Sequence, residues 1–156
     1  MKGRVAGPML PLDDPVVAGL LDPAQPNLAR IAYIGLDGRP RVVPIWFLYR
    51  NDAFVMVTGP KAEKVPAIEK NGAVALTIDS STPPYHALLI NGDATVEHTD
   101  GMAAEYPDLA RRYLGPAADA YLASMQSRVK EQRRITVRPR SHNILDFQKR
   151  FPKSLR

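Results

Sequence analysis

The sequence LARIAYIGLDGRPRVVPIWFLYRNDAFVMVT (28–58) contains three apolar segments in a row, over residues 28–35, 41–49 and 53–58. The dipeptide Asp37-Gly38 separates the first two, and such a pair between alternating apolar segments is a strong signal for a tight hairpin. Asn51-Asp52 makes the next turn. The pattern therefore predicts three consecutive strands that pair as an antiparallel meander.

Pro44 lies inside the second of these segments. Proline has no backbone N–H to donate to a ladder, so it belongs at a sheet edge, at a bulge or at a break that faces a ligand. An edge strand that has no ligand and a strand that faces one remain alternative interpretations.

Outward from this stretch, the chain alternates between strand and helix patterns. Lys61 to Lys70 is expected to form a short helix that ends at Asn71-Gly72. Residues 73–79 and 85–98 follow as strands, the second with a bulge at Asn91-Gly92. Further helices are predicted over 15–21 (capped by Asp14), 102–114 and 116–130, and final strands over 134–138 and 143–147.

This order, with its short hairpins, predicts a mainly β protein with helices: an antiparallel barrel with flanking helices rather than a parallel βαβ sheet. The 156 residues suit a single domain over 1–156, in which 102–130 is helical and 131–156 holds the final strands and a basic tail. No apolar run approaches the roughly 20 residues that a membrane-spanning helix needs.

The formal charge of +5 is unevenly distributed. Residues 128–156 carry ten Lys and Arg against two acidic residues, whereas residues 1–127 have a formal charge of −3. A basic tail can attract nucleic acid, but a solvated basic face is the more common outcome, so nucleic acid is an unlikely partner. The absence of cysteine excludes disulfides and thiolate metal sites, and favours a cytoplasmic location.

Motifs for protein-borne chemistry are missing. The sequence has no glycine-rich dinucleotide or P-loop motif, no HExxH and no nucleophile elbow. Its three histidines, His86, His98 and His142, are too scattered to indicate a metal site. We therefore expect no metal and no catalytic side chain; if the protein is an enzyme, a cofactor would supply the reactive group.

One stretch is suited to such a cofactor. Lys61 and Lys64, three residues apart at a helix start, could hold a phosphate together with backbone donors and the Thr58 hydroxyl. The apolar strand 42–46 could provide a flat wall for an aromatic ring. Lysines at this spacing are more often plain surface residues, so spacing alone leaves both interpretations open.

Four segments in fixed order and spacing strengthen the first interpretation. The runs GRPRVVPIWF (38–47), VTGPKAEK (57–64), NGAVALTID (71–79) and PPYHALLINGDA (83–94) resemble the pyridoxamine 5′-phosphate oxidase-like superfamily of FMN-binding split β-barrels, one branch of which uses the deazaflavin coenzyme F-420. The resemblance covers residues 14 to 147. It implies a homodimer with two cofactor sites at the subunit interface. It also implies that the helices over 102–130 are a helical insertion that packs beside the cofactor pocket.

The resemblance also implies roles for particular residues. The strand wall would line the isoalloxazine ring, a phosphate group would lie at the turn that follows the third strand, and Tyr85 would reach the site across the dimer. The implied cofactor-binding residues are Arg41, Val42, Val43, Pro44, Ile45, Trp46, Thr58, Lys61, Lys64 and Tyr85. Val65-Pro66 stands where relatives commonly carry a basic residue, so the phosphate is expected to bind less tightly or to be held by Arg30 or the basic tail instead. The C-terminal arginine and histidine motif of the true oxidases is absent, so pyridoxamine phosphate is not the expected substrate.

The function implied is a flavin- or deazaflavin-dependent oxidoreductase that transfers hydride between its cofactor and a small organic substrate. FMN and coenzyme F-420 are equally supported; the polyglutamyl tail of the deazaflavin would favour further cations such as Lys2, Arg4 and Arg30. The alternative is a protein that binds or sequesters the cofactor without turnover.

Overall fold

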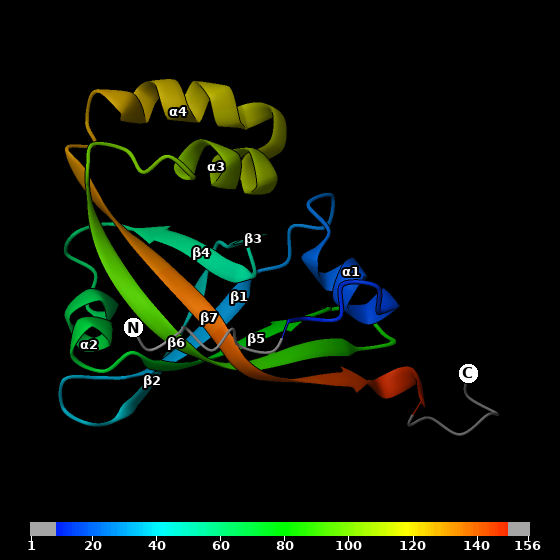
Figure 1. The fold of residues 1–156 in the computed structure, drawn as a ribbon. Helices are drawn as coiled ribbons and strands as arrows, with labels where there is room; N and C mark the ends of the chain where they lie inside the picture. Colours follow the sequence, from blue (N-terminus) through cyan, green and yellow to red (C-terminus); the bar gives the residue numbers. More distant parts are fainter. Residues whose placement is uncertain (1–8, 150–156) are drawn as a thin grey trace.

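The computed structural model describes residues 9–149. Their seven strands form one antiparallel sheet in the order β2-β1-β5-β6-β7-β4-β3. Figure 1 shows the helix pair α3 and α4 above this sheet, with α1 and α2 on either side of it. The elements are α1 (Pro15–Leu21), β1 (Ala29–Ile34), β2 (Pro40–Ile45), β3 (Leu48–Arg50), β4 (Ala53–Thr58), α2 (Lys64–Lys70), β5 (Ala73–Asp79), β6 (His86–Asp100), α3 (Tyr106–Leu114), η1 (Gly115–Ala117), α4 (Ala118–Gln126), β7 (Glu131–Asp146) and η2 (Phe147–Lys149).

The two edge strands of the sheet, β2 and β3, are neighbours in the sequence. Only Trp46 and Phe47 separate them. An extended residue spans at most about 3.5 Å, so this link brings the two edges within roughly 11 Å of each other at that point. The sheet must therefore curl until its edges meet at one end, which is consistent with the predicted split barrel.

The predicted meander is wrong in one respect. The segment over 41–49 is two strands, because β2 pairs with β1 and β3 pairs with β4, with no ladder between β2 and β3. The chain crosses from one sheet edge to the other at Trp46 and Phe47, and the side chains of these two residues pack into different clusters. The hairpin at Asp37-Gly38 is confirmed, and so is the edge position of Pro44.

The last strand also differs from the prediction. Residues 134–138 and 143–147 were expected as separate strands, but β7 is continuous from Glu131 to Asp146 along β6. The predicted bulge is confirmed beside Asn91-Gly92, and the extra residue is Arg140 of β7, which lies between the partners of those two residues. The bulge lets Pro139 remain in the ladder region, so the strand passes the proline without a break.

Among the described α-helices, α1 alone begins at a side-chain cap. Asp14 caps α1, and its carboxylate accepts from the backbone N–H of Val16 at 2.8 Å. The helices predicted over 102–114 and 116–130 are shorter, with α3 starting at Tyr106 and α4 ending at Gln126. No helix within residues 9–149 is long and apolar enough to cross a bilayer.

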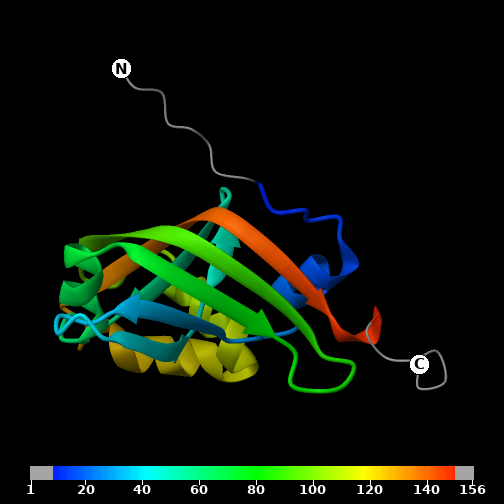
Figure 2. The ribbon, with the colours of Figure 1, turned by 90° about the horizontal axis from the view of Figure 1, so that it is seen from below.

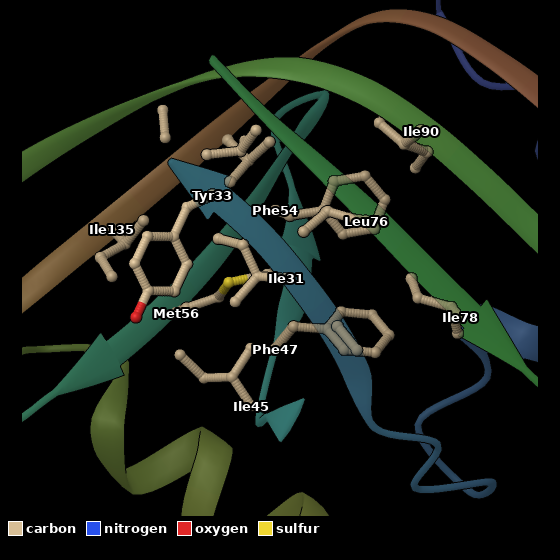
Figure 3. Packing of buried hydrophobic residues seen from close by; sticks show 14 of the residues in the cluster. Ile31, Tyr33, Ile45, Phe47, Phe54, Met56, Leu76, Ile78, Ile90 and Ile135 are labelled. Carbon is tan, nitrogen blue, oxygen red and sulfur yellow. The ribbon is translucent and has the colours of Figure 1, made fainter. Parts of the chain in front are cut away.

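The main core fills the inside of the curled sheet. Figure 3 shows large side chains from β1, β4, β5, β6 and β7 pointing toward one another. Phe47 and Phe54, both fully buried, pack with their ring centroids 5.7 Å apart. A smaller cluster holds α3 against the sheet and contains Leu48, Val57, Ala103 and Leu109. The two clusters lie on either side of the Trp46–Phe47 link, which fixes α3 beside the split in the barrel.

Candidate functional site

The turn between β4 and α2 carries the predicted phosphate-binding lysines. The helix was expected to begin at Lys61, but α2 begins at Lys64. Pro66 explains the difference: a helix starting at Lys61 would need a backbone N–H from Pro66 and would drive its ring into the carbonyl of Ala62. Lys61 therefore lies in the turn before the helix, and Lys64 is the first helical residue.

A first cleft of about 550 Å³ lies between this turn and the β1–β2 hairpin. Arg41 lines it from the hairpin, Lys61 from the turn and Tyr33 from β1. Arg41 is ion-paired with Asp37 at 2.7 Å, which lowers the pKa of the Asp37 carboxyl and raises that of the guanidinium. Part of the positive charge of Arg41 is thereby neutralised, and Lys61 is the lining cation that has no ion pair among the described residues.

Lys64 is the second unpaired cation here. Its side chain is half-buried, and burial lowers the pKa of its ammonium group. No carboxylate in residues 9–149 forms an ion pair with it, and it lines neither of the clefts described in this section. A half-buried ammonium without a partner loses hydration that an anionic ligand would replace, which is the property expected of a phosphate-binding lysine.

A second cleft of about 730 Å³ lies on the other side of the same turn. Thr58 and Lys61 line it from the end of β4, and Tyr106 lines it from α3. Its remaining wall is formed between Met125 of α4 and Gln132 of β7. Lys61 and Pro60 line both clefts, so the turn is the partition between them.

The predicted ring wall is only partly available. Along β2, Val42 is 65% exposed and Pro44 is exposed, whereas Ile45 is buried in the core. Trp46 lies beyond the end of β2, and its ring stacks on Tyr113 of α3, with centroids 5.1 Å apart and planes 3° from parallel. Trp46 therefore belongs to the packing of α3 rather than to the exposed surface of the strand.

Tyr85 is not brought to the other predicted residues. It lies in the loop before β6, beside the Ala29–Ile78 end of the ladder, whereas the first cleft lies at the Gly35 end. Figure 2 shows the 80–85 loop at one end of the sheet and α2 with the β1–β2 hairpin at the other. In this protomer Arg41, Thr58, Lys61 and the start of α2 gather around the turn, and Tyr85 lies apart.

The sequence prediction missed several residues of the second cleft. Arg128 and Lys130 line it, as does Met125 of α4. The surplus of positive charge after residue 128 was the available signal, but only the fold shows that these two cations face the end of β4. Arg30, suggested for a polyglutamyl tail, is ion-paired with Asp79. Lys2 and Arg4 lie outside the described residues.

Histidines and carboxylates show pairwise contacts only. His86 Nε2 lies 3.3 Å from Asp146 Oδ1, and His98 Nε2 lies 3.5 Å from Glu69 Oε1. Within the part of the chain that the structure describes, no three His, Asp or Glu side chains come together in a way that could hold a metal ion.

Comparisons with known proteins concern the family and the fold of the chain. A family model described as pyridoxamine 5′-phosphate oxidase matches residues 17–139. Among solved structures, one titled F420 reductase is 27% identical, with a TM-score of 0.62, and the match covers 80% of this chain and 94% of that one. No curated protein matches this sequence.

Two more distant structures share the fold. A conserved hypothetical protein from Mycobacterium tuberculosis is 16% identical, with a TM-score of 0.67, and the match covers 97% of this chain and 94% of that one. The heme storage protein HutZ from Vibrio cholerae is 12% identical, with a TM-score of 0.60, and the match covers 85% of this chain and 93% of that one. At these identities the likeness concerns the fold alone.

Proposed function

The chain belongs to the pyridoxamine 5′-phosphate oxidase-like family, and from that premise we propose that it is an oxidoreductase that uses FMN or the deazaflavin coenzyme F-420. The observation that carries the proposal is the pair of unpaired lysines at the turn between β4 and α2. Lys61 lines the first cleft, and Lys64 is half-buried with no carboxylate partner among the described residues. The likeness to a protein titled F420 reductase supports the deazaflavin, and family membership supports FMN.

The residues present fit the phosphate of such a cofactor. Lys61 and Lys64 would neutralise it, and the Thr58 hydroxyl, at the end of β4 on the same turn, is an available donor. Arg41 is a weaker candidate because Asp37 already neutralises much of its charge. The exposed side of β2 at Val42 would provide an apolar surface, and burial against it would exclude water.

When bound, either cofactor accepts or donates a hydride at its ring and supplies the redox chemistry. The residues of this chain would then bind and orient the reactants rather than react themselves. That division of roles agrees with a sequence that has no nucleophile motif. The substrate is proposed to be a small organic molecule.

Dimerisation belongs to the same proposal. Tyr85 lies at the far end of the sheet from Lys61 within one protomer, so it would reach a cofactor only if a second copy contributed it. A homodimer with two interfacial sites is therefore proposed, and a cytoplasmic location is proposed with it. The alternative is a binding protein without turnover, and the HutZ likeness shows that this fold also occurs in a protein described as a storage protein.

The test is a titration of the purified protein with FMN and with coenzyme F-420, followed by absorbance. We expect saturable binding of one of them and a loss of more than about a hundredfold in affinity in Lys61→Ala/Lys64→Ala, because two charge-assisted contacts of about 1.5 kcal/mol each are removed. The matched control, Lys70→Ala/Arg138→Ala, removes two exposed cations outside both clefts and should bind within about twofold of wild type.

Two results would count against the proposal. Wild-type affinity in Lys61→Ala/Lys64→Ala would place the phosphate elsewhere, and no binding of either cofactor would remove the redox function. Binding without hydride transfer to a panel of enones, quinones and nitro compounds would favour the storage alternative.

A further inference from the structure

The second cleft has a composition that a cofactor phosphate does not account for. Three cations line it, Lys61, Arg128 and Lys130, and none forms an ion pair among the described residues. The one carboxylate on its lining, Glu131, lies 3.5 Å from the Arg133 guanidinium and is thereby neutralised. The cleft therefore has a net positive charge that no described protein group balances.

The same cleft has an apolar wall. The Tyr106 ring lines it, and its hydroxyl is 2.8 Å from that of Tyr121, so the polar end of Tyr106 already has a partner. Behind it, the rings of Tyr106 and Trp46 are stacked with centroids 6.5 Å apart. Val57 and Met125 complete an apolar surface beside the cations. Cations next to a flat aromatic wall are suited to a ligand with an anionic group and an aromatic or apolar body.

Two hydrogen bonds tie the walls of this cleft to the ends of the sheet strands. The Gln132 side chain accepts from the backbone N–H of Ala103 at 2.8 Å, which fixes the start of the α3 segment on β7. Gly101 donates to the Lys130 carbonyl at 2.8 Å, which anchors the segment that carries Arg128 and Lys130. These bonds hold the cationic and aromatic sides in place before any ligand arrives, which reduces the ordering cost of binding.

We propose that the second cleft binds the organic substrate, and that this substrate is an organic anion with an aromatic or apolar body, recognised by Lys61, Arg128 and Lys130 against Tyr106. This inference rests on the proposed oxidoreductase function, because it assigns the substrate class of that reaction. At about 730 Å³ the cleft is within the range for small-molecule sites. Because the cations are solvent-accessible, binding weakens as salt is raised.

The test uses the full chain without cofactor and two fluorescent probes. One is 8-anilinonaphthalene-1-sulfonate, an aromatic anion; the other is N-phenyl-1-naphthylamine, its uncharged relative. We expect saturable binding of the sulfonate to wild type and at least a tenfold loss of its affinity in Arg128→Glu/Lys130→Glu, while the uncharged probe changes less than twofold. The matched control, Lys70→Glu/Arg138→Glu, makes the same change in net charge outside the cleft and should leave both probes within twofold.

Every outcome of this design bears on the proposal. Equal losses in the two double variants would show a general charge effect and overturn it, as would no saturable binding of the sulfonate to wild type. Should Arg128→Glu/Lys130→Glu have an altered melting curve, Arg128→Gln/Lys130→Gln replaces it, with the matching Lys70→Gln/Arg138→Gln control. Because no cofactor is present, a failure of the proposed redox function leaves the probe result unchanged, and the two failures are distinguishable.

Discussion

Tyr113→Phe tests how the curled sheet is held closed beside the split. The Tyr113 hydroxyl accepts from the backbone N–H of Phe47 at 3.1 Å and donates to the carbonyl of Asn27 at 2.8 Å. Phe47 lies in the link between the two edge strands, where no ladder partner exists. One hydroxyl on α3 therefore satisfies two backbone groups that the sheet leaves free.

The magnitude follows from those two bonds. A typical hydrogen bond contributes about 1 kcal/mol net, and a partly buried group left without a partner costs about 1–3 kcal/mol. We expect Tyr113→Phe to lower the free energy of unfolding by about 2 kcal/mol, because the ring and its packing remain. For a chain of this size that corresponds to a fall in Tm of about 4–8 °C.

The assay is urea and thermal unfolding followed by circular dichroism. Tyr121→Phe is the matched control: its hydroxyl contacts only the Tyr106 hydroxyl among the described residues, so we expect a loss below about 1 kcal/mol. A Tyr113→Phe protein as stable as wild type, or less affected than Tyr121→Phe, would refute the role given to this hydroxyl.

Two further predictions concern pH and backbone spacing. Burial raises the pKa of Tyr106 and of Tyr113 above the ordinary 10.0. Above that pH the unfolded chain loses protons that the folded chain keeps, so the urea midpoint of unfolding should fall as the pH rises beyond 10.0. An unchanged midpoint at pH 11, about one unit above that value, would contradict this. Gly92→Ala would place a Cβ 2.7 Å from the Arg138 carbonyl oxygen at the bulge and should cost more than about 2 kcal/mol in chemical denaturation. Gly19→Ala, in a helix with nothing within 4 Å, should be neutral or stabilising by about 0.5–1 kcal/mol, and equal effects of the two would argue against the bulge geometry.

The features that sequence predicted well are the ones set by neighbouring residues. Asp37-Gly38 fixes its hairpin through local turn geometry, and Asp14 caps its helix within three residues. Residues 73–79 form a strand with the predicted bounds. In each case the conformational preferences of a few adjacent residues determine the local structure.

The missed features depend on distant contacts. Trp46 and Phe47 have strand-forming side chains, and nothing local shows that the chain crosses there from one edge of the sheet to the other. At that crossing the backbone N–H of Phe47 donates to the hydroxyl of Tyr113, which is 66 residues away in sequence.

In the candidate site, too, the part formed by neighbouring residues was predicted and the part formed by distant residues was not. The turn with Lys61 and Lys64 was predicted because its residues are contiguous in the sequence. The second cleft was not, because Thr58, Tyr106 and Lys130 come from separate elements that only the fold brings together.

Lys61 lies on the partition between the two clefts. An anion bound in one cleft neutralises part of the Lys61 charge, which lowers the positive potential in the other cleft. Binding of an anion in one cleft therefore weakens binding of an anion in the other. Reciprocity requires each to weaken the other by the same factor. Two separate anions would thus bind with negative cooperativity, and release of either one would favour capture of the other.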